Sequence, residues 1–101
     1  MNNIKKRMVF LGDLENNFGG WVIRRIHDCN MSMSSLTKMV GISRTSISRY
    51  KHGQDPHISK FFMICDVIST QSGKSLDDVI LDASKTFPEY SMAKEREAKR
   101  K

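Results

Sequence analysis

The sequence has few of the residues that stabilise small secreted proteins or mark linkers. It contains two cysteines in 101 residues, Cys29 and Cys65, and they are far apart with no CxxC spacing. A disulfide framework in so short a chain needs more cysteines than this. We therefore predict that both are buried as small apolar side chains in a reducing compartment. With no Gly/Ser-rich linker and no internal repeat, the chain reads as a single domain.

Long apolar runs are also missing. No run approaches the roughly 20 apolar residues that a membrane span needs. Near the start, the run "MVFL" is followed at once by the polar stretch "GDLENN", which is unlike the core of a signal peptide. We therefore expect a cytoplasmic protein with no membrane partner.

Motifs for catalysis, metal binding and cofactors are missing as well. The sequence has no HExxH, no G-x-S-x-G and no P-loop. Its three histidines, His27, His52 and His57, are not joined by cysteines into a tetrahedral zinc set. The pair Asp77 and Asp78 is explained more simply as the first turn of a helix. We expect no enzyme activity, no metal and no cofactor.

Positive charge is what the sequence has in excess. There are 17 Lys and Arg residues against 11 Asp and Glu, a formal net charge of +6. About half of this excess lies in the closing stretch "AKEREAKRK", with five basic residues against two glutamates, but the rest of the chain remains basic. This balance suggests an acidic partner, either nucleic acid or an anionic membrane surface.

Apolar residues recur at helical spacing, and we therefore predict an all-α fold. The predicted helices cover residues 18–29, 33–40, 44–51, 59–69 and 76–83. The stretch "STQSGK" between the last two is predicted to be a loop, and Pro88 to end regular structure. After Tyr90 we expect a solvated helix or a disordered tail. The residues predicted to face the core are Phe18, Val22, Ile26, Cys29, Leu36, Met39, Val40, Ile47, Tyr50, Ile58, Phe61, Phe62, Ile64, Cys65, Val67, Ile68, Leu76, Val79 and Ile80.

The most informative stretch is "SLTKMVGISRTSISRYKHG", two short amphipathic pieces hinged at Gly41. A glycine readily supplies the left-handed residue that ends a helix. Ser32 or Ser34 is placed to cap the first helix, and Ser43 the second. The second piece, "RTSISRYK", has only Ile47 and Tyr50 as large apolar residues. A helix that only packs would not need so polar an outer face, so we expect an anionic partner there.

Counting from Met33 as position one of a twenty-residue unit, apolar residues fall at positions four, eight, ten, fifteen and eighteen, and Gly41 at position nine. This pattern resembles the helix-turn-helix of the bacteriophage repressor/Cro (XRE) family. The stretches "KHGQDPHISKFFMICDVI" and "KSLDDVI" are similar to the segments after the recognition helix in that family. The resemblance implies a five-helix, lambda-repressor-like domain over residues 18–83, with an N-terminal extension (1–17) and a basic C-terminal tail (84–101).

The sequence departs from the family pattern at three positions. Thr37 stands where alanine is usual, and its hydroxyl can bond back to the helix backbone. Many members pair a glutamate after the recognition helix with an arginine of the first helix, but Lys51 and Ile26 occupy those places here. That ion pair is therefore expected to be absent.

The resemblance also implies roles for individual residues. Residues that would meet base edges in the major groove are Arg44, Thr45 and Arg49. Residues that would contact the phosphates are Ser32, Met33, Ser43, Ser46, Ser48, Lys51 and His52.

The function that we expect from this pattern is sequence-specific regulation of transcription, most simply repression. The partner would be double-stranded DNA with a two-fold operator, bound by a homodimer, so the cytoplasmic protein would lie on the nucleoid. One alternative is an antitoxin-like module that neutralises a protein toxin and binds its own operator. Another is a basic protein of the membrane surface, although the polar helix face gives no reason to expect it.

Overall fold

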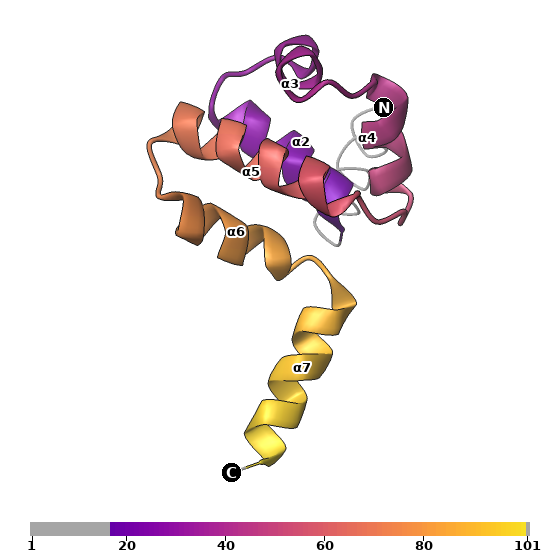
Figure 1. Ribbon diagram of the computed structural model, residues 1–101, viewed down its shortest axis with the longest axis vertical. Coiled ribbons are helices and arrows are strands. Elements are labelled where there is room, and N and C mark those ends of the chain that lie inside the picture. Colours follow the sequence, from indigo (N-terminus) through magenta and orange to yellow (C-terminus); the bar gives the residue numbers. More distant parts are fainter. Residues whose placement is uncertain (1–16, 101) are drawn as a thin grey trace, which may run out of the picture.

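The computed structural model describes residues 17–100, and within this range it contains six α-helices and no strand (Figure 1). The all-α prediction is confirmed. The N-terminal extension expected over residues 1–17 lies outside the described residues, apart from Asn17. The helices are α2 (Phe18–Asp28), α3 (Met33–Val40), α4 (Arg44–Lys51), α5 (Ile58–Ser72), α6 (Leu76–Ser84) and α7 (Pro88–Lys99).

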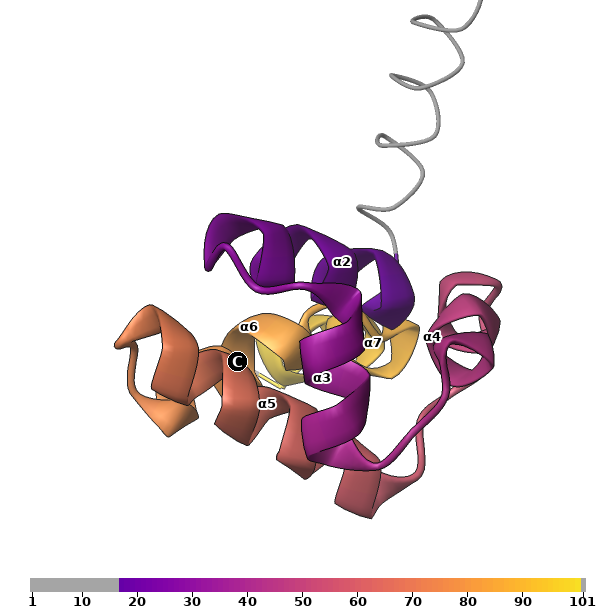
Figure 2. The ribbon, with the colours of Figure 1, turned by 90° about the horizontal axis from the view of Figure 1, so that it is seen from above.

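Five of these helices surround one apolar core. Helix α2 packs against α4, and α5 packs against α3 and α6 as well as against α2. Figure 2 looks down on α3, with α4 beside it and α5 below. The buried apolar residues are Phe18, Trp21, Val22, Ile26, Leu36, Val40, Ile47, Tyr50, Phe61, Ile64, Cys65, Ile68, Val79 and Ala83.

Phe18 lies at the centre of an aromatic cluster that joins distant parts of the chain. Its ring centroid is 5.6 Å from that of Trp21, 5.8 Å from Tyr50, 5.4 Å from Phe61 and 5.6 Å from Phe87. Such separations are those of favourable stacked and tilted aromatic pairs. The first residue of α2 thus contacts α4, α5 and the segment that leads into α7.

Helices α2 and α4 approach each other so closely that a glycine is required between them. A Cβ atom added at Gly19 would lie 2.1 Å from the backbone nitrogen of Lys51. Beside this contact, the Asn17 side chain accepts a hydrogen bond from the Gly20 N–H at 2.9 Å and donates one to the Lys51 carbonyl. Asn17 therefore caps the start of α2 and satisfies a carbonyl at the end of α4.

Helix α6 is attached to α2 through the carboxylate of Asp82. Asp82 Oδ2 accepts hydrogen bonds from Trp21 Nε1 at 2.7 Å and from Arg25 Nε at 3.0 Å. The guanidinium of Arg25 also contacts Asp28 at 2.8 Å, so it bridges two carboxylates. This network gives the buried indole N–H the partner that it needs.

The apolar faces of three helices are narrower than the sequence suggested. Cys29 is only half-buried. Met39 is 56% exposed, Ile58 62%, Phe62 47% and Leu76 42%, so the prediction that these four face the core is wrong. Helical spacing shows which side of a helix is apolar. The neighbouring helices here cover only part of that side, so apolar residues at its edges remain exposed.

Two predicted boundaries are also wrong. Helix α5 continues through the predicted loop to Ser72 and ends only at Gly73, whose φ of 76° is left-handed. Its last turn is closed by the Ser69 hydroxyl, which donates to the Lys74 carbonyl at 2.7 Å. Pro88 begins α7 instead of ending regular structure, because a proline is tolerated in the first turn of a helix, where its missing N–H has no helical partner to lose.

Candidate nucleic-acid interface

Helices α3 and α4 form the helix-turn-helix pair, and the hinge between them has the predicted chemistry. Gly41 has a φ of 76°, and its N–H donates to the Thr37 carbonyl at 2.8 Å. The Ser43 hydroxyl accepts from the Ser46 N–H at 3.2 Å and so caps α4. Lys60 of α5 donates to the Val40 carbonyl at 3.2 Å, which satisfies a carbonyl at the end of α3. Hydrogen bonds from the end of α3, the start of α4 and Lys60 of α5 thus fix the turn.

Helix α4 is anchored by its two large apolar residues. Ile47 and Tyr50 are both buried, as predicted. The ring of Tyr50 lies against Phe18, and burial raises the pKa of the Tyr50 phenol above its ordinary value. Because Gly19 and Asn17 also contact the end of this helix, α4 has little freedom to move relative to α2.

The opposite side of α4 is exposed and basic. Arg44, Thr45, Ser48 and Arg49 are exposed, and Ser46 is half-buried. Thr45 and Arg49 are four residues apart and share one face of the helix. Within the described part of the chain, no carboxylate forms an ion pair with Arg44 or Arg49. No carboxylate of residues 17–100 therefore neutralises their positive charge through an ion pair.

Arg44 has a contact that the sequence did not reveal. Its guanidinium NH2 group donates to the Ser34 hydroxyl at 2.7 Å, so the first residue of α4 is tied to the first turn of α3. Of the two serines predicted as possible caps of α3, Ser32 takes that role, because its hydroxyl accepts from the Ser35 N–H at 3.1 Å. Ser34 and Arg44 are ten residues apart across the hinge, and no local pattern predicts their contact.

The residues expected to contact phosphates fall into two groups. One group lies at helix N-termini: Ser32 and Met33 begin α3, and Ser43 with Ser46 begins α4. Backbone N–H groups and the helix dipole favour an anion at such positions.

The second group lies along the last turns of α4. Ser48 is exposed and Lys51 is half-buried. His52 follows as the C-cap residue, and its Nδ1 lies 2.7 Å from the Ser48 carbonyl. Since a carbonyl only accepts, Nδ1 carries a proton and Nε2 points elsewhere.

Comparison with known families decides what this pair of helices is. A family model of the Cro/C1-type HTH DNA-binding domain matches residues 23–73, just over half of the chain. The chain belongs to the Cro/C1-type helix-turn-helix family. The match extends from the middle of α2 through α5 and so includes both helices of the pair, which confirms the resemblance seen in the sequence. No curated protein and no solved structure is significantly similar to the chain.

Membership of this family makes the protein a DNA-binding regulator. Families of Cro/C1-type domains are in general not enzymes. None of the helices in residues 17–100 is long and apolar enough to cross a membrane. In the same part of the chain, no three His, Cys, Asp or Glu side chains are placed to hold a metal ion together.

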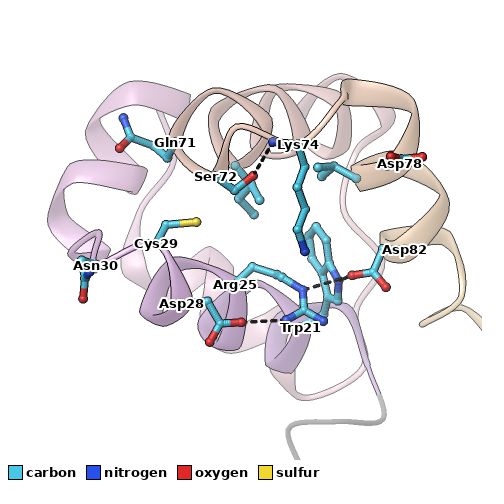
Figure 3. A pocket seen from close by; sticks show the side chains of 12 residues that line it. Trp21, Arg25, Asp28, Cys29, Asn30, Gln71, Ser72, Lys74, Asp78 and Asp82 are labelled. Carbon is cyan, nitrogen blue, oxygen red and sulfur yellow. Dashed lines mark hydrogen bonds and ion pairs between the residues drawn. The ribbon is translucent and has the colours of Figure 1, made fainter.

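A polar cleft of about 740 Å³ lies outside the helix pair of the Cro/C1-type domain, between the end of α2, the end of α5 and α6 (Figure 3). Figure 3 shows Lys74 reaching toward Trp21, with the ion pair between Arg25 and Asp82 below it. Partial burial would raise the pKa of Asp82, but hydrogen bonds from Trp21 and Arg25 outweigh it and hold the pKa below its ordinary value. Arg25 pairs with two of the three carboxylates that line this cleft, Asp28 and Asp82, and so joins α2 to α6.

Proposed function

We propose that the protein is a sequence-specific transcriptional regulator that inserts α4 into the major groove, with residues 18–83 as its DNA-binding unit. The observation that carries the proposal is the contrast between the two sides of α4. One side is buried against α2, which fixes the orientation of the helix, and the other is exposed and basic. A helix held in this way can present the same side chains to successive base pairs.

In this proposal Arg44, Thr45 and Arg49 read base edges. An arginine fork matches the O6 and N7 acceptors of guanine, and a threonine methyl packs on the methyl of thymine. Arg44 would exchange its 2.7 Å contact with Ser34 for a base, or would keep it and be held by Ser34 in the reading position. In either case Ser34 affects the position of Arg44.

The phosphate contacts come from both ends of the helix pair. Ser32, Met33, Ser43 and Ser46 would bind the backbone at the N-termini of α3 and α4, where N–H groups are available. The remaining contacts would come from Ser48, Lys51 and His52. These contacts set the position of α4 and the salt dependence of binding, but they carry no sequence information.

We infer a homodimer on a two-fold operator, and the size of the reading surface supports it. One recognition helix contacts only a few base pairs, whereas two helices about 34 Å apart multiply the discrimination. Repression by covering a promoter is the simplest mode of action. In the cell we expect the protein in the cytoplasm, bound to the nucleoid.

The experiment that tests this function is fluorescence anisotropy with DNA from the region upstream of the protein's own gene. A scrambled duplex of the same composition is measured beside it at several salt concentrations. We expect tight binding to the native duplex that persists near physiological salt, and much weaker, salt-sensitive binding to the scrambled one. Equal affinity for both duplexes on every candidate promoter would contradict sequence-specific reading.

A further inference from the structure

The two arginines proposed to read bases differ in how their side chains are held. Arg44 and Arg49 are both exposed on α4. The guanidinium NH2 group of Arg44 donates to the Ser34 hydroxyl at 2.7 Å, whereas the Arg49 side chain forms no hydrogen bond or ion pair within residues 17–100. A long side chain that is free in solution must be ordered when it binds, and this ordering costs affinity. Arg44 is already restrained before it meets a partner.

The hydrogen bond to Ser34 leaves Arg44 able to contact a base. A guanidinium has five N–H donors, and this bond uses one of the two on the NH2 group. The four that remain include a pair able to bond the O6 and N7 acceptors of guanine side by side. Ser34 lies in the first turn of α3, and Arg44 is the first residue of α4. A residue outside the recognition helix therefore restrains the guanidinium without occupying it.

We propose that Ser34 is a positioning residue that sets how sharply Arg44 discriminates between base pairs. The proposal rests on the proposed function, and in it Arg44 keeps its contact with Ser34 when DNA is bound. Ser34 holds the guanidinium at one place relative to the helix pair, so less freedom is lost on binding. A donor pair that is fixed in this way also favours one base edge over the others. Arg49 has no such contact and is positioned by the DNA alone.

Binding of DNA strengthens the bond between Arg44 and Ser34. In the free protein the bond is exposed, and the helix dipole disfavours a cation beside the start of α3. The phosphate that we propose at Ser32 and Met33 places a negative charge at that same helix end. Water also leaves the interface when α4 enters the groove, and a hydrogen bond is stronger where the dielectric constant is lower. Both changes favour the guanidinium in its place against Ser34.

The Ser34 hydroxyl can be removed without disturbing the helix pair. Ser34 is exposed, its hydroxyl contacts only Arg44 within the described residues, and Ser32 is the residue that caps α3. Ser35 offers a matched control, because it is the next residue of the same helix and is also an exposed serine. The Ser35 hydroxyl contacts Ser32 and not Arg44.

The first test compares base discrimination by variants of the full chain. Wild type selects its preferred duplex from a random double-stranded library, and anisotropy against each single base-pair change of that duplex gives the discrimination at each position. We expect Arg44→Ala to abolish discrimination at one base pair, and Ser34→Ala to lower it at the same base pair by about threefold to tenfold. Ser34→Thr keeps a hydroxyl and should restore it, and Ser35→Ala should leave it unchanged.

The sign of the change separates a retained contact from an exchanged one. If Arg44 gave up Ser34 in order to reach a base, the hydroxyl would compete with DNA, and Ser34→Ala would bind the preferred duplex more tightly. That result would overturn the proposal. An equal loss on all duplexes would make Ser34 a phosphate contact and would overturn it as well.

The double variant Ser34→Ala/Arg44→Ala tests whether the two residues act together. Because Ser34 acts through Arg44, the double variant should bind every duplex as Arg44→Ala does. Losses that add would show that Ser34 acts independently of Arg44, contrary to the proposal.

The second test follows the contact in the free protein. NMR exchange measurements give the rate at which each guanidinium rotates about its Nε–Cζ bond. A hydrogen bond slows this rotation, so we expect Arg44 to rotate more slowly than Arg49 in wild type and at an equal rate in Ser34→Ala. Equal rates in wild type would show that the contact is absent in solution, and the proposal would fail.

Failure of this proposal can be distinguished from failure of the proposed function. A wild type that selects no preferred duplex contradicts sequence-specific reading, and with it any reading role for Ser34. A preferred duplex whose discrimination does not depend on Arg44 leaves sequence reading by the rest of α4 in place and overturns the role of Ser34 alone.

Discussion

Helices α4 and α7 differ both in their charge and in the contacts that hold them. Both are short and have few large apolar residues, but α4 carries three basic residues and no acidic one, whereas the three basic residues of α7 are balanced by Glu89, Glu95 and Glu97. In α4 both large apolar residues, Ile47 and Tyr50, are buried, whereas in α7 none is. Excess positive charge is therefore one feature that separates α4 from α7. A second feature is the set of contacts behind α4, which keep its outer face in one orientation.

The contacts behind α4 come from residues that carry no positive charge. Gly19 permits the close approach of α2, Asn17 bonds to the last carbonyl of α4, and Phe18 packs on Tyr50. A binding surface is precise only when the residues that support it are themselves fixed. The comparison therefore predicts that changes behind α4 weaken DNA binding, and that equivalent changes in α7 do not.

The largest effect is expected from Gly19→Ala. The new Cβ would overlap the backbone of Lys51, so α2 and α4 must separate. We expect a loss of about 3 kcal/mol or more in the free energy of unfolding, and weaker binding to all DNA. Urea denaturation measures the first, and anisotropy the second. Ser91→Ala, an exposed change on α7, is the control and should leave both unchanged; equal behaviour of the two variants would remove the distinction between the helices.

The next largest effect is expected when a large apolar side chain of each helix is truncated to alanine. Ile47→Ala should lower the free energy of unfolding by about 2–5 kcal/mol, because it leaves a cavity between α4 and the core. In a dilute sample, where any dimer has dissociated, Met92→Ala should change it by less than about 0.5 kcal/mol. Thermal or urea unfolding measures both. A large loss from Met92→Ala under these conditions would mean that α7 packs on its own body.

Removing an arginine from the outer face of each helix tests DNA reading directly. Arg49→Ala should cost about 1–3 kcal/mol on the preferred site and relax specificity at one base pair. Lys51→Ala should weaken binding to all sequences similarly and flatten the salt dependence. Arg96→Ala on α7 should leave the sequence preference intact. Anisotropy against native and scrambled duplexes distinguishes the three, and equal, sequence-independent losses from Arg49→Ala and Lys51→Ala would argue against base reading by Arg49.

The smallest effect on the free energy of unfolding is expected at Asp82, the carboxylate that joins α6 to α2. Its folded-state pKa lies below the ordinary value, so the stability that it provides is present above about pH 4, the pKa of an unfolded aspartate. That stability is lost as the pH falls through the lower folded pKa. Because the carboxylate is about half exposed, we expect only about 1 kcal/mol at neutral pH.

Urea unfolding of Asp82→Asn at pH 7 and pH 3 measures this contribution. The variant should be less stable than wild type at pH 7 and should approach it at pH 3. A difference that does not change with pH would show that shape and packing, and not the charge, account for the role of Asp82. Asp66→Asn, an exposed carboxylate with no ion pair in the described residues, is a suitable control.

The sequence by itself was sufficient for the helix pair. Left-handed Gly41 and the cap at Ser43 depend on interactions within a few residues of the chain, and Ile47 and Tyr50 stand out as the only large apolar residues of α4. The cap of α3 was narrowed to Ser32 or Ser34. Such local interactions leave a clear pattern in the order of residues. The hydroxyl of Thr37, which donates to the Ser34 carbonyl at 3.1 Å, was predicted for the same reason.

Only the tertiary structure decided which apolar residues stay outside and which polar residues meet. Ile58 and Phe62 have the spacing of core residues, yet no element of the described chain covers them. Arg44 contacts Ser34, Asp82 contacts Trp21, and Gly19 of α2 lies against the end of α4. Each of these contacts joins residues that are distant along the chain. Periodicity reports which side of a helix is apolar, but not how much of that side a neighbour buries, because burial depends on how the helices cross.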